Sequence, residues 1–81
     1  MALILQINLS RSRLAQELLD QFCRGRGVDL LILSEQFRTP SDRDWFSDRT
    51  GYAAIVVRNQ ERFPVSGAGN GAGYVWIRSG G

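Results

Sequence analysis

The chain contains no histidine and a single cysteine, Cys23. Without histidine, a serine or cysteine nucleophile has no imidazole base, and zinc has no imidazole ligand. One thiol cannot form a disulfide within the chain, and it is too few for a thiolate metal cluster. Cys23 falls on a predicted helix, where we expect it to act as a small core hydrophobe. The metal ligands that remain are carboxylate and amide oxygens, which suit magnesium or manganese.

Lysine is also absent, so all ten basic residues are arginines, and eight acidic residues leave a net charge of +2. An excess of two positive charges does not by itself indicate nucleic-acid binding. Arginine suits phosphate because its planar fork donates two parallel hydrogen bonds. Codon composition is the simpler explanation of a basic set made of arginine alone.

Long apolar runs are missing as well. No segment approaches the length of a membrane span, and residues 1–7 lack the basic lead of a signal peptide. We therefore expect a soluble intracellular protein with no membrane partner. Its 81 residues correspond to one small domain, near the size at which a single core barely stabilises itself.

The first half of the chain has the pattern of a β-α-β unit. Apolar residues 2–7 predict a buried strand, residues 11–24 an amphipathic helix and residues 28–33 a second buried strand. A serine before the helix and a glycine after it fit a cap and a stop signal. The candidates are Ser10 or Ser12 for the cap and Gly25 or Gly27 for the stop.

Helical spacing predicts which residues of this helix face the core. Leu14, Leu18 and Phe22 recur at every fourth position, and Leu19 and Cys23 widen the stripe. The opposite side is polar. We expect this stripe to face the core.

Polar side chains close both predicted strands. Asn8 ends the first and Glu35 ends the second. A crossover brings the ends of two parallel strands to the same edge of a sheet, where ligands usually bind in α/β folds. An amide and a carboxylate there form a candidate site for a metal ion and a phosphate. On spacing alone, the simpler interpretation of Glu35 is the polar end of a strand.

The second half of the chain predicts further strands joined by polar segments. Residues 52–58 (YAAIVVR) and 74–78 (YVWIR) read as strands, and residues 63–65 as a short edge piece. Residues 67–73 (GAGNGAG) predict a flexible hairpin loop, because a dinucleotide-binding glycine motif must follow a strand and open a helix.

The segment 39–51 predicts a solvated connection pinned by Trp45 and Phe46. Asp42, Asp44 and Asp48 lie near these aromatics, but Phe46 and Ser47 stand where a calcium loop needs an oxygen ligand and a glycine. The whole pattern predicts an α/β fold that is the beginning of a larger layered domain.

Three segments together resemble the endonuclease domain of non-LTR retrotransposons. These are LQINL (5–9) with SRLAQ (12–16), VDLLILSE (28–35), and GYAAIVV (51–57). That domain belongs to the endonuclease/exonuclease/phosphatase superfamily, together with exonuclease III and the apurinic/apyrimidinic endonucleases. The resemblance implies a DNase I-like α/β sandwich, of which residues 1–81 would be the N-terminal part.

The resemblance also implies roles for individual residues. Asn8 matches the asparagine beside the metal and the scissile phosphate, and Glu35 matches the glutamate that binds catalytic Mg²⁺ or Mn²⁺. Ser10 stands where many relatives have an acid or amide near the metal, and Gln36 stands where retrotransposon relatives often have proline. Arg11 and Arg13 follow Asn8 and are candidate contacts to DNA phosphates, or simply an exposed first helical turn.

The family's later motifs would lie beyond Gly81. They are a catalytic tyrosine, an Asp-x-Asn segment and a closing Ser-Asp-His. We therefore expect a fragment of a magnesium-dependent DNA endonuclease, a hydrolase that is inactive alone. Its partners would be DNA, the remaining part of the domain and the reverse transcriptase of the parent element, which acts in the nucleus.

Two other interpretations remain open at this point. One keeps the superfamily but changes the substrate, giving a repair endonuclease or a phosphatase relative. The other is a non-catalytic remnant or small interaction module, in which exposed strand edges favour self-association.

Overall fold

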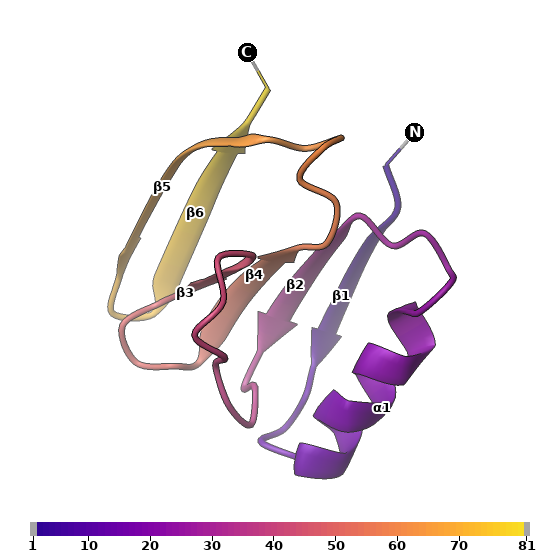
Figure 1. Ribbon diagram of the computed structural model, residues 1–81. Coiled ribbons are helices and arrows are strands. Elements are labelled where there is room, and N and C mark those ends of the chain that lie inside the picture. Colours follow the sequence, from indigo (N-terminus) through magenta and orange to yellow (C-terminus); the bar gives the residue numbers. More distant parts are fainter. Residues whose placement is uncertain (1, 81) are drawn as a thin grey trace.

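The strands form two sheets of unequal size. The structure is a computed structural model that describes residues 2–80. A four-stranded mixed sheet has the order β1-β2-β4-β3, and β5 and β6 form a separate two-stranded hairpin (Figure 1). The elements of the described residues are β1 (Ile4–Asn8), α1 (Arg13–Cys23), β2 (Leu30–Ser34), β3 (Trp45–Ser47), β4 (Ala53–Val57), β5 (Val65–Gly71) and β6 (Tyr74–Ser79).

The predicted β-α-β unit is confirmed. β1 and β2 are parallel, in a register that pairs Ile4 with Leu30 and Asn8 with Ser34. β4 pairs antiparallel with the other side of β2, so the apolar β2 is a central strand, as its composition predicts. The carboxyl ends of β1 and β2 lie together at the lower edge of the sheet in Figure 1.

Helix α1 begins and ends on sequence signals. Of the two candidate caps it is Ser12 that acts, because its Oγ accepts a hydrogen bond of 3.0 Å from the Ala15 N–H. Beyond the helix, Gly25 and Gly27 both have a left-handed backbone, with φ of 75° and 67°. Glycine adopts this conformation without steric cost.

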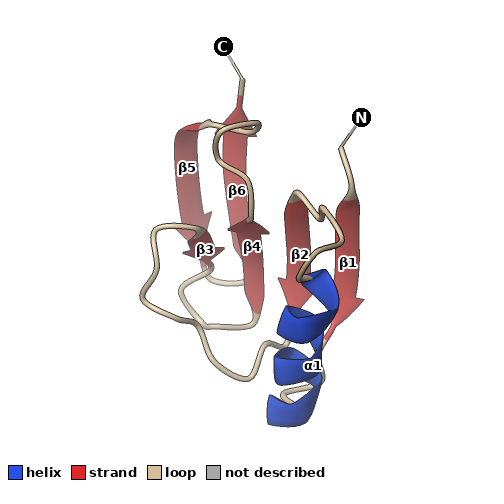
Figure 2. Ribbon diagram, turned by 45° about the vertical axis from the view of Figure 1, so that its right-hand side comes forward, coloured by secondary structure: helices blue, strands red, loops and turns tan. Residues whose placement is uncertain are grey.

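The predicted apolar stripe of the helix faces the core only in part, and the prediction is wrong for Leu14, Leu18 and Phe22. These three residues are 64%, 52% and 47% exposed, whereas Leu19 and Cys23 are buried. The helix lies over β1 and β2 (Figure 2), and it turns the Leu19–Cys23 side toward them. No second helix among residues 2–80 covers the other apolar row.

The main core lies between α1 and one face of the sheet. Alternating residues of β2 and β4 join the helix there; they are Leu31, Leu33, Ala54 and Val56. Cys23 belongs to this cluster, and burial raises the pKa of its thiol. Val57 is fully buried but alternates to the opposite face, which places it on the side of β4 away from the helix.

The prediction of a flexible loop at residues 67–73 is wrong, because residues 67–71 belong to β5. Glycine is normally depleted in strands, but here it makes room for side chains of β6. Gly69 pairs with Trp76, and a Cβ on Gly69 would lie 2.7 Å from Trp76 Nε1. The turn itself is short and contains Gly73, with φ of 86°.

The segment 39–51 is also more structured than its polarity predicts. It contains β3, which pairs with β4, and Asp48 is buried. Hairpin β5–β6 packs beside β3 and β4, away from α1 (Figures 1 and 2). Within residues 2–80, no helix is both long and apolar enough to cross a membrane.

Candidate functional site at the carboxyl ends of β1 and β2

The side chains of Asn8 and Glu35 meet, as the strand order predicts. Asn8 is the last residue of β1, and Glu35 directly follows β2. Asn8 Nδ2 donates a hydrogen bond of 2.7 Å to Glu35 Oε2, across 27 positions of sequence. We call this place, with the adjoining Ser10, Arg11 and Tyr52, the Asn8–Glu35 edge.

The backbone of Glu35 is held from both sides. Its N–H donates to the carbonyl of Tyr52, and its own carbonyl accepts from the N–H of Arg11, each at 2.7 Å. Glu35 has a left-handed φ of 51°, and Ser10 and Arg11 have φ of 51° and 59°. Such values are uncommon for residues other than glycine. Their clustering at a polar strand end is typical of a functional site.

Asn8 is oriented by the turn that follows it. Its Oδ1 accepts hydrogen bonds from the Ser10 N–H at 2.8 Å and from the Ser10 hydroxyl at 3.3 Å. The amide nitrogen therefore points to Glu35, and the amide oxygen points to Ser10. In this arrangement Asn8 acts as a hydrogen-bond donor that positions the Glu35 carboxylate.

The donor set at this edge fits a magnesium-type ion in kind. Magnesium commonly takes one or two protein carboxylates and completes its shell with waters and substrate phosphate. Glu35 supplies one carboxylate, and its bond to Asn8 is exposed. Residues 2–80 contain no group of three or more acidic or cysteine side chains that could hold a metal. A ligand role for Asn8 stays a prediction, because its oxygen accepts from Ser10.

The two candidate arginines differ in their surroundings. The Arg11 guanidinium lies over the ring of Tyr52, with 4.0 Å from Cζ to the ring centroid. Arg13 is on the exposed first turn of α1, where its Nε lies 3.9 Å from Glu17 Oε1. The structure thus brings Arg11, but not Arg13, into contact with another residue of the Asn8–Glu35 edge.

No family model, curated protein or solved structure matches this chain. The structure shows a small mixed α/β domain with one mixed sheet and one helix among its described residues. The chemistry of the Asn8–Glu35 edge therefore has to be argued from its own residues.

Two further residues hold this region together, and no sequence pattern indicates their role. Tyr52 reads as the start of a strand, yet its carbonyl fixes Glu35. Gln16 reads as part of a polar helix face, yet its Oε1 accepts from the N–H groups of Phe37 at 2.7 Å and Arg38 at 3.2 Å. Gln16 therefore ties the segment after Glu35 to the helix. Only the folded chain shows these long-range contacts.

A groove of about 530 Å³ lies elsewhere, between α1 and the segment that follows β2. Four arginines line it, but three of them already face an acid, and the first is Arg13 beside Glu17. Arg24 and Arg58 both lie within 4 Å of Asp20, at 2.9 and 3.8 Å. The groove contains neither Asn8 nor Glu35, so it does not extend the candidate site.

Proposed function

We propose that this chain contributes the first two polar groups of a divalent-metal-dependent DNA endonuclease site. The fold would be the DNase I-like sandwich of the endonuclease/exonuclease/phosphatase superfamily, in the form found in non-LTR retrotransposons. The observation that carries the proposal is the 2.7 Å hydrogen bond between Asn8 and Glu35 at the carboxyl ends of parallel strands. The sequence resemblance adds the reaction class.

In this reaction a water molecule attacks a DNA phosphorus in line with the 3′ oxygen. The new O–P bond replaces the P–O3′ bond, the water loses a proton, and the 3′ oxygen gains one. A divalent ion, when bound, supplies positive charge for the phosphate oxygens and activates water. Glu35 would hold that ion, and the Asn8 amide would hold the carboxylate and donate its second N–H to a phosphate oxygen.

The nick leaves a 3′ hydroxyl, which would prime reverse transcription in a parent retroelement. DNA and a reverse transcriptase are thus the proposed partners. The Asp-x-Asn and Ser-Asp-His groups of the resembled family have no counterpart at the Asn8–Glu35 edge. We therefore propose that the 81-residue chain by itself cleaves DNA at no useful rate, since each lost catalytic group typically costs two or more orders of magnitude.

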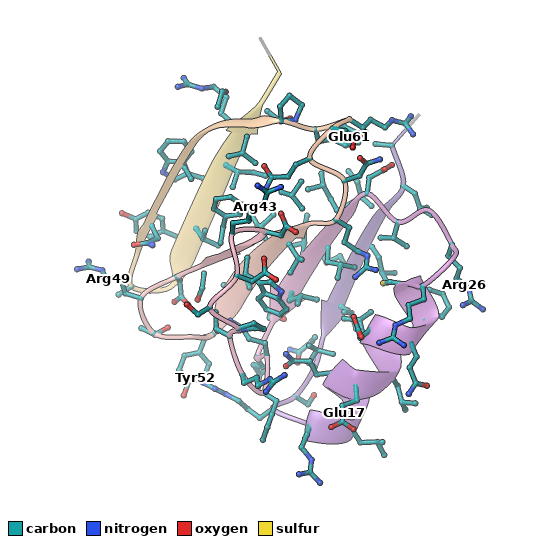
Figure 3. All side chains as sticks on the ribbon, viewed as in Figure 1. Glu17, Arg26, Arg43, Arg49, Tyr52 and Glu61 are labelled. Atoms are coloured by element: carbon teal, nitrogen blue, oxygen red, sulfur yellow. The ribbon has the colours of Figure 1, made fainter. Side chains whose placement is uncertain are left out.

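A chimera tests the proposal. Residues 1–81 are joined to the complementary later part of a retrotransposon endonuclease domain, and nicking of supercoiled plasmid is measured in Mg²⁺. We expect Mg²⁺-dependent nicking that Glu35→Gln lowers by about two orders of magnitude or more. Glu17→Gln, an exposed carboxylate on α1 (Figure 3), is the matched control and should leave the rate unchanged. Full activity in Glu35→Gln would refute the assignment.

The same chimera separates the substrates of the superfamily. A retrotransposon-type enzyme nicks intact plasmid, whereas a repair endonuclease prefers an abasic site and a phosphatase relative releases phosphate from a small ester. Parallel assays of the three substrates decide among them.

One observation favours a non-catalytic interaction module instead. Leu14, Leu18 and Phe22 form an apolar row on the exposed side of α1. Within the described residues, β1 lies at the edge of the sheet, so one of its sides has no neighbouring strand. A second copy of the chain is the partner that such surfaces would take. Sedimentation that shows a concentration-dependent dimer, abolished by Leu18→Glu, would support this alternative.

A further inference from the structure

Opposite charges at the Asn8–Glu35 edge are kept apart. The backbones of Arg11 and Glu35 are joined by a 2.7 Å hydrogen bond, yet their side chains form no ion pair among the described residues. Glu35 is engaged by the Asn8 amide. Arg11 is engaged by the Tyr52 ring and by the Gln36 carbonyl, which accepts from its Nη1 at 3.3 Å. The carboxylate thus stays open to a cation and the guanidinium to an anion.

The Tyr52 backbone is held by two hydrogen bonds, one of which also holds Glu35. The carbonyl of Tyr52 accepts from the Glu35 N–H, and its N–H donates to Asp48 Oδ1 at 2.9 Å. Tyr52 is 53% exposed, and Figure 3 shows it at the lower border of the molecule. Arg11 therefore lies over an aromatic ring at the surface, beside the site, and the backbone that carries this ring is held by hydrogen bonds.

We propose that Arg11 and Tyr52 form a second subsite, which binds the phosphodiester next to the one held at Asn8 and Glu35. This inference rests on the proposed function for the identity of the neighbouring group. Its ligand is a nucleic-acid strand, and Tyr52 is a positioning residue that acts through Arg11.

The geometry of the pair suits a phosphodiester. A guanidinium stacked on a ring face keeps its N–H donors in its own plane, where they can reach two oxygens of one phosphate. The quadrupole of the ring stabilises the cation. The left-handed backbone of Arg11 directs the side chain back across the edge to the Gln36 carbonyl, so less side-chain entropy is lost on binding.

The chain contains a matched control. Arg26 stacks on Phe22 at 4.2 Å from Cζ to the ring centroid, and its Nη1 donates to the Phe22 carbonyl at 2.7 Å. This pair repeats the chemistry of Arg11 and Tyr52 at the other end of α1. Figure 3 shows Arg26 and Tyr52 on opposite sides of the molecule.

The experiment measures binding of the 81-residue chain to a short fluorescent DNA duplex over a range of salt concentrations, in EDTA. We expect Arg11→Gln to lower the slope of log K against log salt by about one, the loss of one phosphate contact. Tyr52→Leu should produce part of this loss of slope, and Tyr52→Phe should keep the slope of the wild-type chain. Arg26→Gln should leave the slope nearly unchanged.

NMR follows the side chain directly. The Arg11 Nε–Hε signal should show a ring-current shift that Tyr52→Leu removes and Tyr52→Phe retains, and DNA should move this signal further. Arg11→Asn, which tolerates a left-handed backbone, is a second variant if Arg11→Gln does not fold. Inorganic phosphate at the same concentration should move the signal much less than the strand does.

Two results would overturn the subsite. One is an equal loss of slope in Arg26→Gln and Arg11→Gln, which would mean general charge attraction. The other is an equal response to inorganic phosphate and DNA, which would mean a free-anion site. Because EDTA removes the ion, Glu35→Gln should not weaken binding here. An Arg11 effect in EDTA together with an active Glu35→Gln chimera would keep the subsite and reject the proposed endonuclease.

Discussion

Glu35 combines the carboxylate of the candidate site with a strained backbone. Its φ of 51° places a long side chain in a region that L-residues other than asparagine and aspartate rarely occupy. Two backbone hydrogen bonds of 2.7 Å hold it there. The strained conformation aims the carboxylate at Asn8. We therefore expect this conformation to cost some stability.

Replacing Glu35 by glycine should separate these two effects. Glycine adopts a left-handed φ freely, and the lost hydrogen bond to Asn8 is exposed, so we expect the free energy of unfolding to rise by up to about 1 kcal/mol. Gln6→Gly, at an exposed position of β1, should instead cost about 0.5–1 kcal/mol. Urea denaturation followed by tryptophan fluorescence measures both. A Glu35→Gly loss as large as that of Gln6→Gly would show that no strain is stored.

For single residues, the sequence predicts at which edge of the sheet a polar side chain lies, but not which side chains it contacts. Asn8 and Glu35 can be placed together from strand order alone, because parallel strands end at one edge. The Asn8 amide orientation depends on Ser10, and the stacking of Arg11 depends on Tyr52. Both are set by local backbone angles that the residue types do not encode.

Among the elements, α1 shows where periodicity stops being informative. The helix has two apolar rows, and spacing alone cannot tell which of them faces the sheet. Packing on β1 and β2 selects the row that contains Leu19 and Cys23. The strand β5 shows a similar limit. Taken alone, the glycines of this segment predict a loop. They fit a strand because the facing side chains of β6 occupy the space where a Cβ would lie.

Alanine substitutions in α1 should distinguish the two rows. Leu19 is buried, so Leu19→Ala should lower the free energy of unfolding by about 2–4 kcal/mol. Leu18 is 52% exposed, so Leu18→Ala should cost less than about 1 kcal/mol. Both replace the same side chain on adjacent helical positions, which makes each the control for the other in urea denaturation. Equal costs would mean that the helix packs in a different rotation.

Across the whole molecule, one buried carboxylate joins the hairpin to the four-stranded sheet. Asp48 Oδ1 accepts from the N–H groups of Tyr52 at 2.9 Å and Ala53 at 3.1 Å, and Oδ2 accepts from the Gly73 N–H at 2.9 Å and from the Thr50 hydroxyl. Tyr52 and Ala53 lead into β4, whereas Gly73 is in the turn of the β5–β6 hairpin. Asp48 therefore also supports the backbone of Tyr52, and with it the Asn8–Glu35 edge.

This carboxylate should make the stability of the fold depend on acid. Burial alone would raise the pKa of Asp48, but the hydrogen bonds from the Thr50 hydroxyl and from three backbone N–H groups hold it far below its ordinary value. A folded-state pKa below the unfolded one stabilises the protein above the unfolded pKa, and this contribution is lost as pH falls toward the folded one. The free energy of unfolding should thus decrease below about pH 4.

Asp48→Asn should remove most of this acid dependence. It should also lower the free energy of unfolding at neutral pH by about 2–3 kcal/mol, because the amide oxygen accepts hydrogen bonds more weakly than a carboxylate and the amide NH2 group cannot accept any. Urea denaturation between neutral pH and strongly acidic pH measures both effects. Asp42→Asn, in the same segment but exposed, is the control and should preserve the wild-type profile. An unchanged acid profile in Asp48→Asn would place the acid-sensitive group elsewhere in the fold.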